Sequence, residues 1–158
     1  MKASETQIAE HRKGEFVVST DKERIDLDVV HNFLTESYWA QGIPRELVVC
    51  SIENSLCFGV YGDGKQVGFA RVVSDYATFA YIGDVFVLES YRGHGLGKWL
   101  MECIMVHPRL QGLRRWSLVT GDAHSLYTKF GFTPLKAPEN YMERHDPAVY
   151  RLDKNLRG

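Results

Sequence analysis

The segment YRGHGLGKWL at residues 91–100 contains the residue types that bind an anion. Three glycines alternate there and a cation stands on each side of them: Gly93, Gly95, Gly97, Arg92 and Lys98. Because glycine has no side chain, the backbone N–H groups of such a loop can approach a ligand closely. The apolar spacing that follows predicts a helix, whose N-terminus attracts negative charge. The segment therefore predicts a phosphate-binding site; the alternative is a strand-to-helix turn that needs glycine only for its backbone angles.

Two widespread phosphate-binding motifs do not match this segment. A P-loop would have its first glycine where this chain has Arg92, and a serine or threonine where it has Trp99. A dinucleotide-binding G-x-G-x-x-G motif would need its third glycine at Lys98, within a repeated parallel βαβ unit. The sequence therefore disfavours a nucleoside triphosphatase and a dinucleotide-dependent enzyme.

A different motif, R-x-x-G-x-G, is formed by Arg92, Gly95 and Gly97 directly after an apolar segment, and AHSLYTKFGF follows at residues 123–132. The paired motifs resemble those of the GNAT superfamily of acyl-CoA-dependent N-acyltransferases, and the resemblance extends over residues 16–135. One position departs from the family pattern, because Thr120 stands where many members have asparagine.

The resemblance implies which residues bind acetyl-CoA as a co-substrate. In the family, backbone amides of the R-x-x-G-x-G loop bind the coenzyme A pyrophosphate. Backbone N–H groups of the preceding strand bind the acyl and pantetheine portions. Carried over to this chain, the expected contacts are Phe86, Val87, Arg92, Gly93, His94, Gly95, Leu96, Gly97 and Lys98.

Tyr127 is the candidate general acid. The resemblance implies a tyrosine near the thioester sulfur, where a phenol can protonate the departing thiolate. Periodicity alone supports another interpretation, because Tyr127 shares a helical stripe with Ala123, Leu126 and Phe130 and would then be a core residue. Substitution by phenylalanine separates the two interpretations, since it keeps the packing and removes the proton donor.

Asp84 is a carboxylate inside an otherwise apolar segment, FAYIGDVFVL at residues 79–88. An unpaired charge is costly there, which favours a role in accepting a proton from an amine or in holding an ammonium group. The resemblance also implies such a base, because some family members have one at this place. The alternative is a structural aspartate bound to backbone amides or to a neighbouring arginine such as Arg71.

Four aromatic residues are candidates for the wall of an acceptor pocket: Tyr38, Trp39, Phe79 and Tyr81. Such a wall suits a cationic or aromatic amine. Core packing is the alternative. A small amine, an amino acid, an aminoglycoside and a protein amine all remain possible acceptors.

Alternating strands and helices must position these residues. Strands are expected at 16–20, 56–61, 66–74, 79–88 and 114–120, with shorter extended pieces at 132–135 and 147–152. Helices are expected at 26–39, at 44–56, from the glycine loop to residue 107, and at 122–131. The order predicts an α+β fold, an α/β sandwich whose mixed, largely antiparallel central sheet is flanked by helices in a GNAT-like arrangement.

Local signals support these elements. Asp26 and Asp122 are expected to cap helices, and Asp63-Gly64 predicts a hairpin turn. The helix after the glycine loop should bury one stripe: Leu96, Trp99, Leu100, Cys103 and Ile104. Residues 1–14 are polar and expected to be loose, which leaves 15–158 as a single GNAT-like domain.

Composition limits the classes of function. The 158 residues carry 19 Lys+Arg and 20 Asp+Glu without a basic block, which disfavours nucleic acid and membranes as partners. No signal peptide or membrane span is apparent, so a soluble, cytoplasmic protein is expected. The cysteines, Cys50, Cys57 and Cys103, are expected to be buried free thiols. The histidines lack metal-ligand spacing, and no metal is expected.

These observations predict an N-acetyltransferase that transfers an acetyl group from acetyl-CoA to a primary amine of a small molecule or peptide. The transfer would occur by direct attack in a ternary complex, in a monomer or homodimer. Two alternatives are a non-catalytic acyl-CoA-binding sensor or interaction module, and a structural protein that has lost coenzyme A binding.

Overall fold

The computed structural model describes residues 7–151 and shows one six-stranded sheet. The strands lie in chain order: β1 (Glu10–Lys13), β2 (Phe16–Ser19), β3 (Leu56–Gly62), β4 (Lys65–Ser74), β5 (Phe79–Val87) and β6 (Arg115–Leu118). Neighbouring strands are antiparallel except for the parallel pair β5 and β6. The predicted mixed, largely antiparallel sheet is therefore confirmed.

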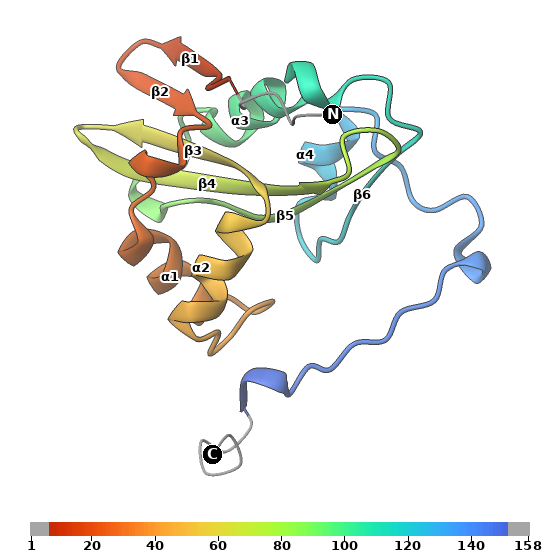
Figure 1. Ribbon diagram of the computed structural model, residues 1–158. Helices are drawn as coiled ribbons and strands as arrows, with labels where there is room; N and C mark the ends of the chain where they lie inside the picture. Colours follow the sequence, from red (N-terminus) through yellow and green to blue (C-terminus); the bar gives the residue numbers. More distant parts are fainter. Residues whose placement is uncertain (1–6, 152–158) are drawn as a thin grey trace.

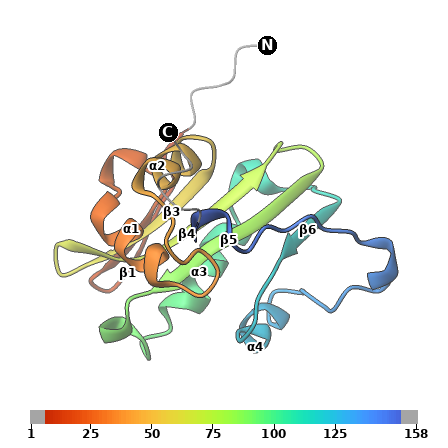
Figure 2. The same cartoon turned by 90° about the horizontal axis from the view of Figure 1, so that it is seen from below.

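Four α-helices cover the two faces of this sheet within the described residues: α1 (Leu27–Glu36), α2 (Arg45–Glu53), α3 (Leu96–Met105) and α4 (His124–Thr128). Figure 1 shows α1 and α2 on one face and α3 and α4 on the other. Short 3-10 turns lie at Lys22–Arg24, Glu89–Tyr91, Pro108–Leu110, Pro138–Asn140 and Val149–Arg151. After α4 the chain runs outward and returns toward the α1–α2 connection, where Arg151 donates to Gln41 at 3.5 Å (Figure 2).

Each face of the sheet has its own hydrophobic core. The core beneath α3 includes the whole predicted stripe: Leu96, Trp99, Leu100, Cys103 and Ile104. The core beneath α1 and α2 includes Val30, Leu34, Phe69 and Phe86. Truncation of a buried leucine such as Leu100 to alanine typically costs about 2–5 kcal/mol of unfolding free energy.

Several local predictions are confirmed. The Oδ1 atom of Asp26 accepts hydrogen bonds from the backbone N–H groups of Asp28 and Val29, at 3.1 and 3.3 Å, and so caps α1. Asp63 and Gly64 have φ of +54° and +73°, as a type I′ hairpin turn requires.

Residues 10–13 form strand β1, so the prediction that residues 1–14 are loose is wrong for this part. The four side chains are polar and mostly exposed, and such an edge strand lacks the apolar alternation that sequence patterns detect. Its structure comes from backbone pairing with β2 through a tight turn at Gly14, whose φ is +60°.

The extended pieces predicted at 132–135 and 147–152 are not strands in the described residues. Pro134 lacks the N–H that a sheet would use. Asp146 instead stabilises a local turn by accepting from the N–H of Ala148, and residues 149–151 form a 3-10 turn; Leu152 lies outside the described residues.

The prediction that all three cysteines are buried is wrong for Cys50, which is exposed on α2. Burial raises the pKa of the Cys57 and Cys103 thiols to about 11. In the part of the chain that the structure describes, no helix is long and apolar enough to cross a membrane. No group of three His, Cys, Asp or Glu side chains among residues 7–151 could hold a metal ion.

Candidate active site

Strands β5 and β6 part after a short parallel pairing, which opens the sheet beside the glycine loop. The pairing runs from Phe79 with Arg115 to Ile82 with Leu118. Beyond this point β5 continues to Val87, whereas β6 ends. The edge of β5 from Gly83 to Val87 therefore has no neighbouring strand among the described residues, and its outward backbone groups can meet a ligand.

Backbone alternation decides which amide of β5 points toward this opening. Leu88 donates its N–H to Val67 in β4 at 2.8 Å, so the N–H of Val87, one residue earlier, points the other way. Phe86 lies opposite Phe69 and directs its N–H toward β4. Of the two predicted acyl contacts, this geometry favours Val87.

The glycine loop leads into a helix whose first N–H groups have no partner within it. Gly95 is the N-cap of α3, with φ of +73° and no capping side chain. The first helical bond runs from the N–H of Trp99 to the carbonyl of Gly95, which leaves the N–H groups of Leu96, Gly97 and Lys98 outside the helical pattern. Three such donors at the positive end of a ten-residue helix are an arrangement that can bind an anion.

Backbone angles favour glycine at two positions of this loop, and open space lies next to them. Gly93 has φ of +86° and Gly95 of +73°, and a Cβ built on either residue would meet no atom within 4 Å. A Cβ on Gly97 would touch only Leu126 of α4, at 3.9 Å. Open space therefore lies beside Gly93 and Gly95, which is compatible with the predicted coenzyme A pyrophosphate.

The predicted cations and His94 surround this loop without closing it. Arg92 folds back and donates from Nε to the carbonyl of Val87 at 3.1 Å, so it joins the loop to the end of β5. His94 and Lys98 are exposed, and the His94 ring lies 6.2 Å from the ring of Phe16.

Tyr127 lies in α4 against the α3 side of the sheet and is 8% exposed. Its ring packs edge-on against Phe132, with the ring centroids 6.1 Å apart. Burial raises the pKa of the Tyr127 phenol, and the nearby Tyr38 and Asp122 raise it further. The phenol is therefore protonated at neutral pH, as a proton donor must be. The structure bears out the core packing and leaves the catalytic role as a prediction.

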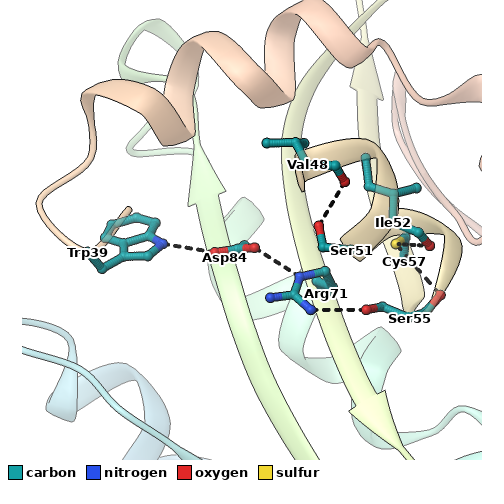
Figure 3. Close-up of polar contacts among 8 residues, drawn as sticks. All are labelled: Trp39, Val48, Ser51, Ile52, Ser55, Cys57, Arg71 and Asp84. Atoms are coloured by element: carbon teal, nitrogen blue, oxygen red, sulfur yellow. Dashed lines mark hydrogen bonds and ion pairs between the residues drawn. The ribbon is translucent and has the colours of Figure 1, made fainter. Parts of the chain in front are cut away.

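Both carboxylate oxygens of Asp84 already accept hydrogen bonds (Figure 3). Arg71 donates from Nε to Oδ2 at 2.9 Å, and Trp39 donates from Nε1 to Oδ1 at 2.9 Å. Arg71 in turn donates from Nη1 to the Ser55 hydroxyl at 3.0 Å. The arrangement matches the structural alternative for Asp84, in which Arg71 compensates its charge.

A β-bulge places Asp84 in this network. Phe69 of β4 lies opposite Phe86 of β5, whereas Arg71 lies opposite Gly83, so β5 has one residue more than β4 between these pairs. Asp84 lies within this extra length and adopts a left-handed φ of +55°, which is uncommon for a residue with a side chain.

The structure brings two of the four predicted aromatic residues into contact and places a third, Tyr81, near Asp84. Tyr38 and Trp39 follow α1 and pack edge-on, with ring centroids 5.1 Å apart. Tyr81 lies near Asp84 and Arg71: burial raises the pKa of its phenol, the charge of Asp84 raises it further, and that of Arg71 opposes. Phe79 lies at the far end of β5, five residues from Asp84, or roughly 16 Å along an extended strand.

Sequence reasoning missed Ser55 as a partner of Arg71, and it missed the role of Thr120. The hydroxyl of Thr120 accepts from the N–H of Ala123 at 3.0 Å and from that of Asp122 at 3.4 Å, before α4. Asp122, the predicted cap, makes no such bond, because α4 begins only at His124. A threonine hydroxyl that accepts from backbone N–H groups two and three residues later forms a local turn, which is a recognisable signal in a sequence.

A cavity of about 970 Å³ lies elsewhere, between β6 and residues 130–142. Trp116, Phe130 and Tyr141 are among its lining residues. None of the predicted site residues lines it, so it is separate from the candidate active site.

Comparison with known proteins places this geometry in a family. A family model described as an acetyltransferase (GNAT) domain matches residues 53–134. This range contains β5, the glycine loop, α3 and α4. The chain belongs to the GNAT acetyltransferase family. The resemblance inferred from the two sequence motifs is thereby confirmed.

Individual relatives agree with this assignment. A protein from Gibberella zeae, provisionally named acetyltransferase FG08082, is 31% identical over 140 residues, which cover 74% of this chain and 78% of that protein. A crystal structure from Xanthomonas campestris pv. campestris, of a protein provisionally assigned as a GNAT acetyltransferase, is 53% identical with a TM-score of 0.85. It covers 88% of this chain and 99% of that one.

A more distant structure shares the GNAT fold. It is that of a predicted acetyltransferase from Clostridium acetobutylicum, solved with acetyl-CoA. It is 11% identical to this chain, with a TM-score of 0.60, and covers 88% of this chain and 96% of that one. At this identity the similarity concerns the fold alone.

Proposed function

We propose that this GNAT family member is an N-acetyltransferase that transfers an acetyl group from acetyl-CoA to a primary amine. One observation carries the proposal: an uncapped helix N-terminus with open glycines lies next to the unpaired edge of β5. The first feature binds a pyrophosphate and the second binds an extended amide-bearing arm. No other described segment combines the two.

The residues that bind acetyl-CoA act through their backbone. The N–H groups of Leu96, Gly97 and Lys98 bind the pyrophosphate, and the N–H of Val87 faces the acyl end. Acetyl-CoA supplies an activated thioester, in which the C–S bond breaks as the C–N bond to the amine forms. Because Val87 donates from a fixed strand, it can polarise the thioester carbonyl without rearrangement.

Tyr127 and Asp84 are proposed to handle the protons. Tyr127, with its raised pKa, donates a proton to the departing sulfur. Asp84 takes the proton that the attacking amine loses, directly or through water. Asp84 can do so only when the amine or a water reaches one of its oxygens; each oxygen already accepts one hydrogen bond, and only 12% of the side chain is exposed. This occupancy is the observation that favours the second candidate, an acyl-CoA-binding module without turnover.

A thiol-release assay with acetyl-CoA and a panel of primary amines tests the proposal. We expect release above the hydrolysis background with at least one amine, together with a rise in melting temperature on addition of acetyl-CoA alone. A rise in melting temperature without release from any amine would support the binding module. The absence of both would contradict coenzyme A binding altogether.

The role of Asp84 has its own test, the pH–rate profile of Asp84→Asn. If Asp84 is the base, the variant loses the rise in rate that the wild type shows as the carboxylate ionises. A variant that keeps the wild-type profile would leave Asp84 as a structural partner of Arg71.

A further inference from the structure

Two adjacent residues after α1 bridge the opening between β5 and β6. Trp39 reaches Asp84 in β5, and the Tyr38 hydroxyl accepts from the N–H of Gly121, after β6, at 3.3 Å. Both side chains are solvent-accessible, since Tyr38 is 68% and Trp39 40% exposed. Two residues of the predicted acceptor wall, Tyr38 and Trp39, therefore contact both β5 and the segment after β6.

Trp39 occupies the one oxygen of Asp84 that can change partners. Oδ2 is held by Arg71, which is fixed by its own bond to Ser55 (Figure 3). Oδ1 is held by the Trp39 indole alone among the described residues. Only 12% of the Asp84 side chain is exposed, which leaves little room for a second donor at Oδ1 beside the indole.

The backbone around Tyr38 and Trp39 is held in place, so only the Trp39 side chain needs to move for Oδ1 to become accessible. The Ser37 hydroxyl donates to the carbonyl of Leu34 at 2.7 Å and accepts from the N–H of Ala40 at 3.1 Å. Ser37 and Ala40 are buried, which anchors the backbone on both sides of Tyr38 and Trp39. Rotation of an exposed side chain is a fast and local motion.

We propose that the Trp39 indole blocks access to Asp84 in the resting protein. A cationic amine acceptor then binds by replacing the indole N–H as the hydrogen-bond donor to Asp84 Oδ1. The inference rests on the proposed function and adds its acceptor class. An ammonium forms a charge-assisted hydrogen bond to a carboxylate, which is about twice as strong as the bond from a neutral donor. The Tyr38 ring packs edge-on against the Trp39 ring, and an aromatic face next to a carboxylate favours a cation. An uncharged alcohol lacks both advantages.

Calorimetry on the coenzyme A-saturated protein tests this exchange. The probe is 1,5-diaminopentane, and 1,5-pentanediol is its uncharged counterpart. Trp39→Phe keeps an aromatic ring but removes the donor that competes for Oδ1. We expect this variant to bind the diamine at least about tenfold more tightly than the wild type, and neither protein to bind the diol.

Tyr38→Phe is the matched control, because it removes the bond to Gly121 and leaves Oδ1 occupied. We expect no tighter binding of the diamine by this variant. Equal or weaker binding by Trp39→Phe, equal tightening by Tyr38→Phe, or no diamine binding at millimolar concentration would each overturn the inference. If one of these results is found while coenzyme A still binds, only the exchange at Trp39 is contradicted and the proposed acyl-CoA site stands. If coenzyme A does not bind either, both proposals are contradicted.

Fluorescence gives a second readout that does not depend on turnover. Trp99 is 7% exposed and Trp116 is partly buried, so Trp39 is the tryptophan most accessible to acrylamide. Addition of diamine to the wild type should increase acrylamide quenching as the indole leaves Asp84, and Trp39→Phe should show no such increase. An unchanged quenching constant in wild type with bound diamine would contradict the exchange.

Discussion

The two sides of the candidate site are built from different parts of the polypeptide. The donor side, residues 93–98, presents backbone N–H groups and open glycines at the start of α3. The acceptor side is formed by Tyr38, Trp39, Arg71 and Asp84, whose side chains come from the segment after α1, from β4 and from β5; Asp84 accepts from both Trp39 and Arg71. A backbone site needs particular φ angles from few residues, whereas a side-chain site needs several distant segments to meet.

This difference predicts how each side responds to substitution. On the donor side, an added Cβ changes the backbone angles, and the exposed side chains of His94 and Lys98 matter little. On the acceptor side, loss of one partner leaves another partner unsatisfied in a partly buried place. Donor binding should therefore be sensitive at glycines, and acceptor binding at hydrogen-bond donors.

The largest effect is expected for Tyr127→Phe, because Tyr127 is the candidate general acid. If the phenol protonates the leaving thiolate, turnover at saturating acetyl-CoA and amine should fall about 10²–10⁴-fold. The ring that packs against Phe132 is retained, so the melting temperature and acetyl-CoA affinity should change little. Undiminished turnover would remove Tyr127 from the mechanism and leave it as a core residue.

Gly95→Ala tests the donor side, and Gly112→Ala is its matched control. Both glycines have φ of +73°, and a Cβ on either would meet no atom within 4 Å. The backbone strain of the two substitutions should therefore be similar, but only Gly95 lies at the proposed anion site. We expect Gly95→Ala to weaken acetyl-CoA binding at least about tenfold, or ~1.4 kcal/mol, by calorimetry. Equal affinities in the two variants would show that the pyrophosphate binds elsewhere.

The same contrast explains how much the sequence could predict. Gly93 and Gly95 indicate the donor side from the sequence alone, because glycine is the residue that most readily adopts their positive φ angles. Periodicity located α3, with its buried stripe from Leu96 to Ile104, since one face of a helix must be apolar. Such signals are local, and the fold and the glycine loop depend on them.

The acceptor side could not be predicted as a network because its contacts are not local. Trp39 and Asp84 are 45 positions apart in the chain, and Asp84 lies at a bulge in β5 that no sequence pattern indicates. Charge indicates a neighbouring arginine such as Arg71 as one possible partner of Asp84, but no sequence pattern indicates Trp39 or Ser55 as further members of the network. Strand β1 was missed for a similar reason, since backbone pairing rather than side-chain pattern forms it.

Thr120→Ala tests whether the threonine at the common asparagine position supports α4 and hence Tyr127. Its hydroxyl accepts hydrogen bonds from the N–H groups of Ala123 and Asp122, and loss of one such hydrogen bond typically costs about 0.5–1.5 kcal/mol. Chemical denaturation should show this loss for Thr120→Ala and a smaller one for Asp122→Ala, because Asp122 does not cap the helix. The reverse order would restore Asp122 as the cap.

The smallest effect is expected at His107. This residue follows the C-terminal end of α3, the helix whose N-terminus belongs to the donor side. Its ring is 3% exposed, packs edge-on against Phe58, and accepts the N–H of Arg109 at Nδ1. Burial lowers the pKa of His107 below its usual 6.5, and the positive charges of Arg109 and His11 lower it further.

The sign of the pH dependence follows from this lowered pKa. Below pH 6.5 the unfolded chain binds a proton at His107 that the folded chain still excludes, so acid favours unfolding. The contribution is complete above pH 6.5 and is lost progressively as the pH falls toward the lowered pKa of the folded state. His107→Asn keeps an acceptor for Arg109 but cannot titrate, so its unfolding free energy should decline less between about pH 7 and 5 than that of the wild type. If the unfolding free energies of the two proteins decline in parallel, groups other than His107 cause the loss of stability in acid.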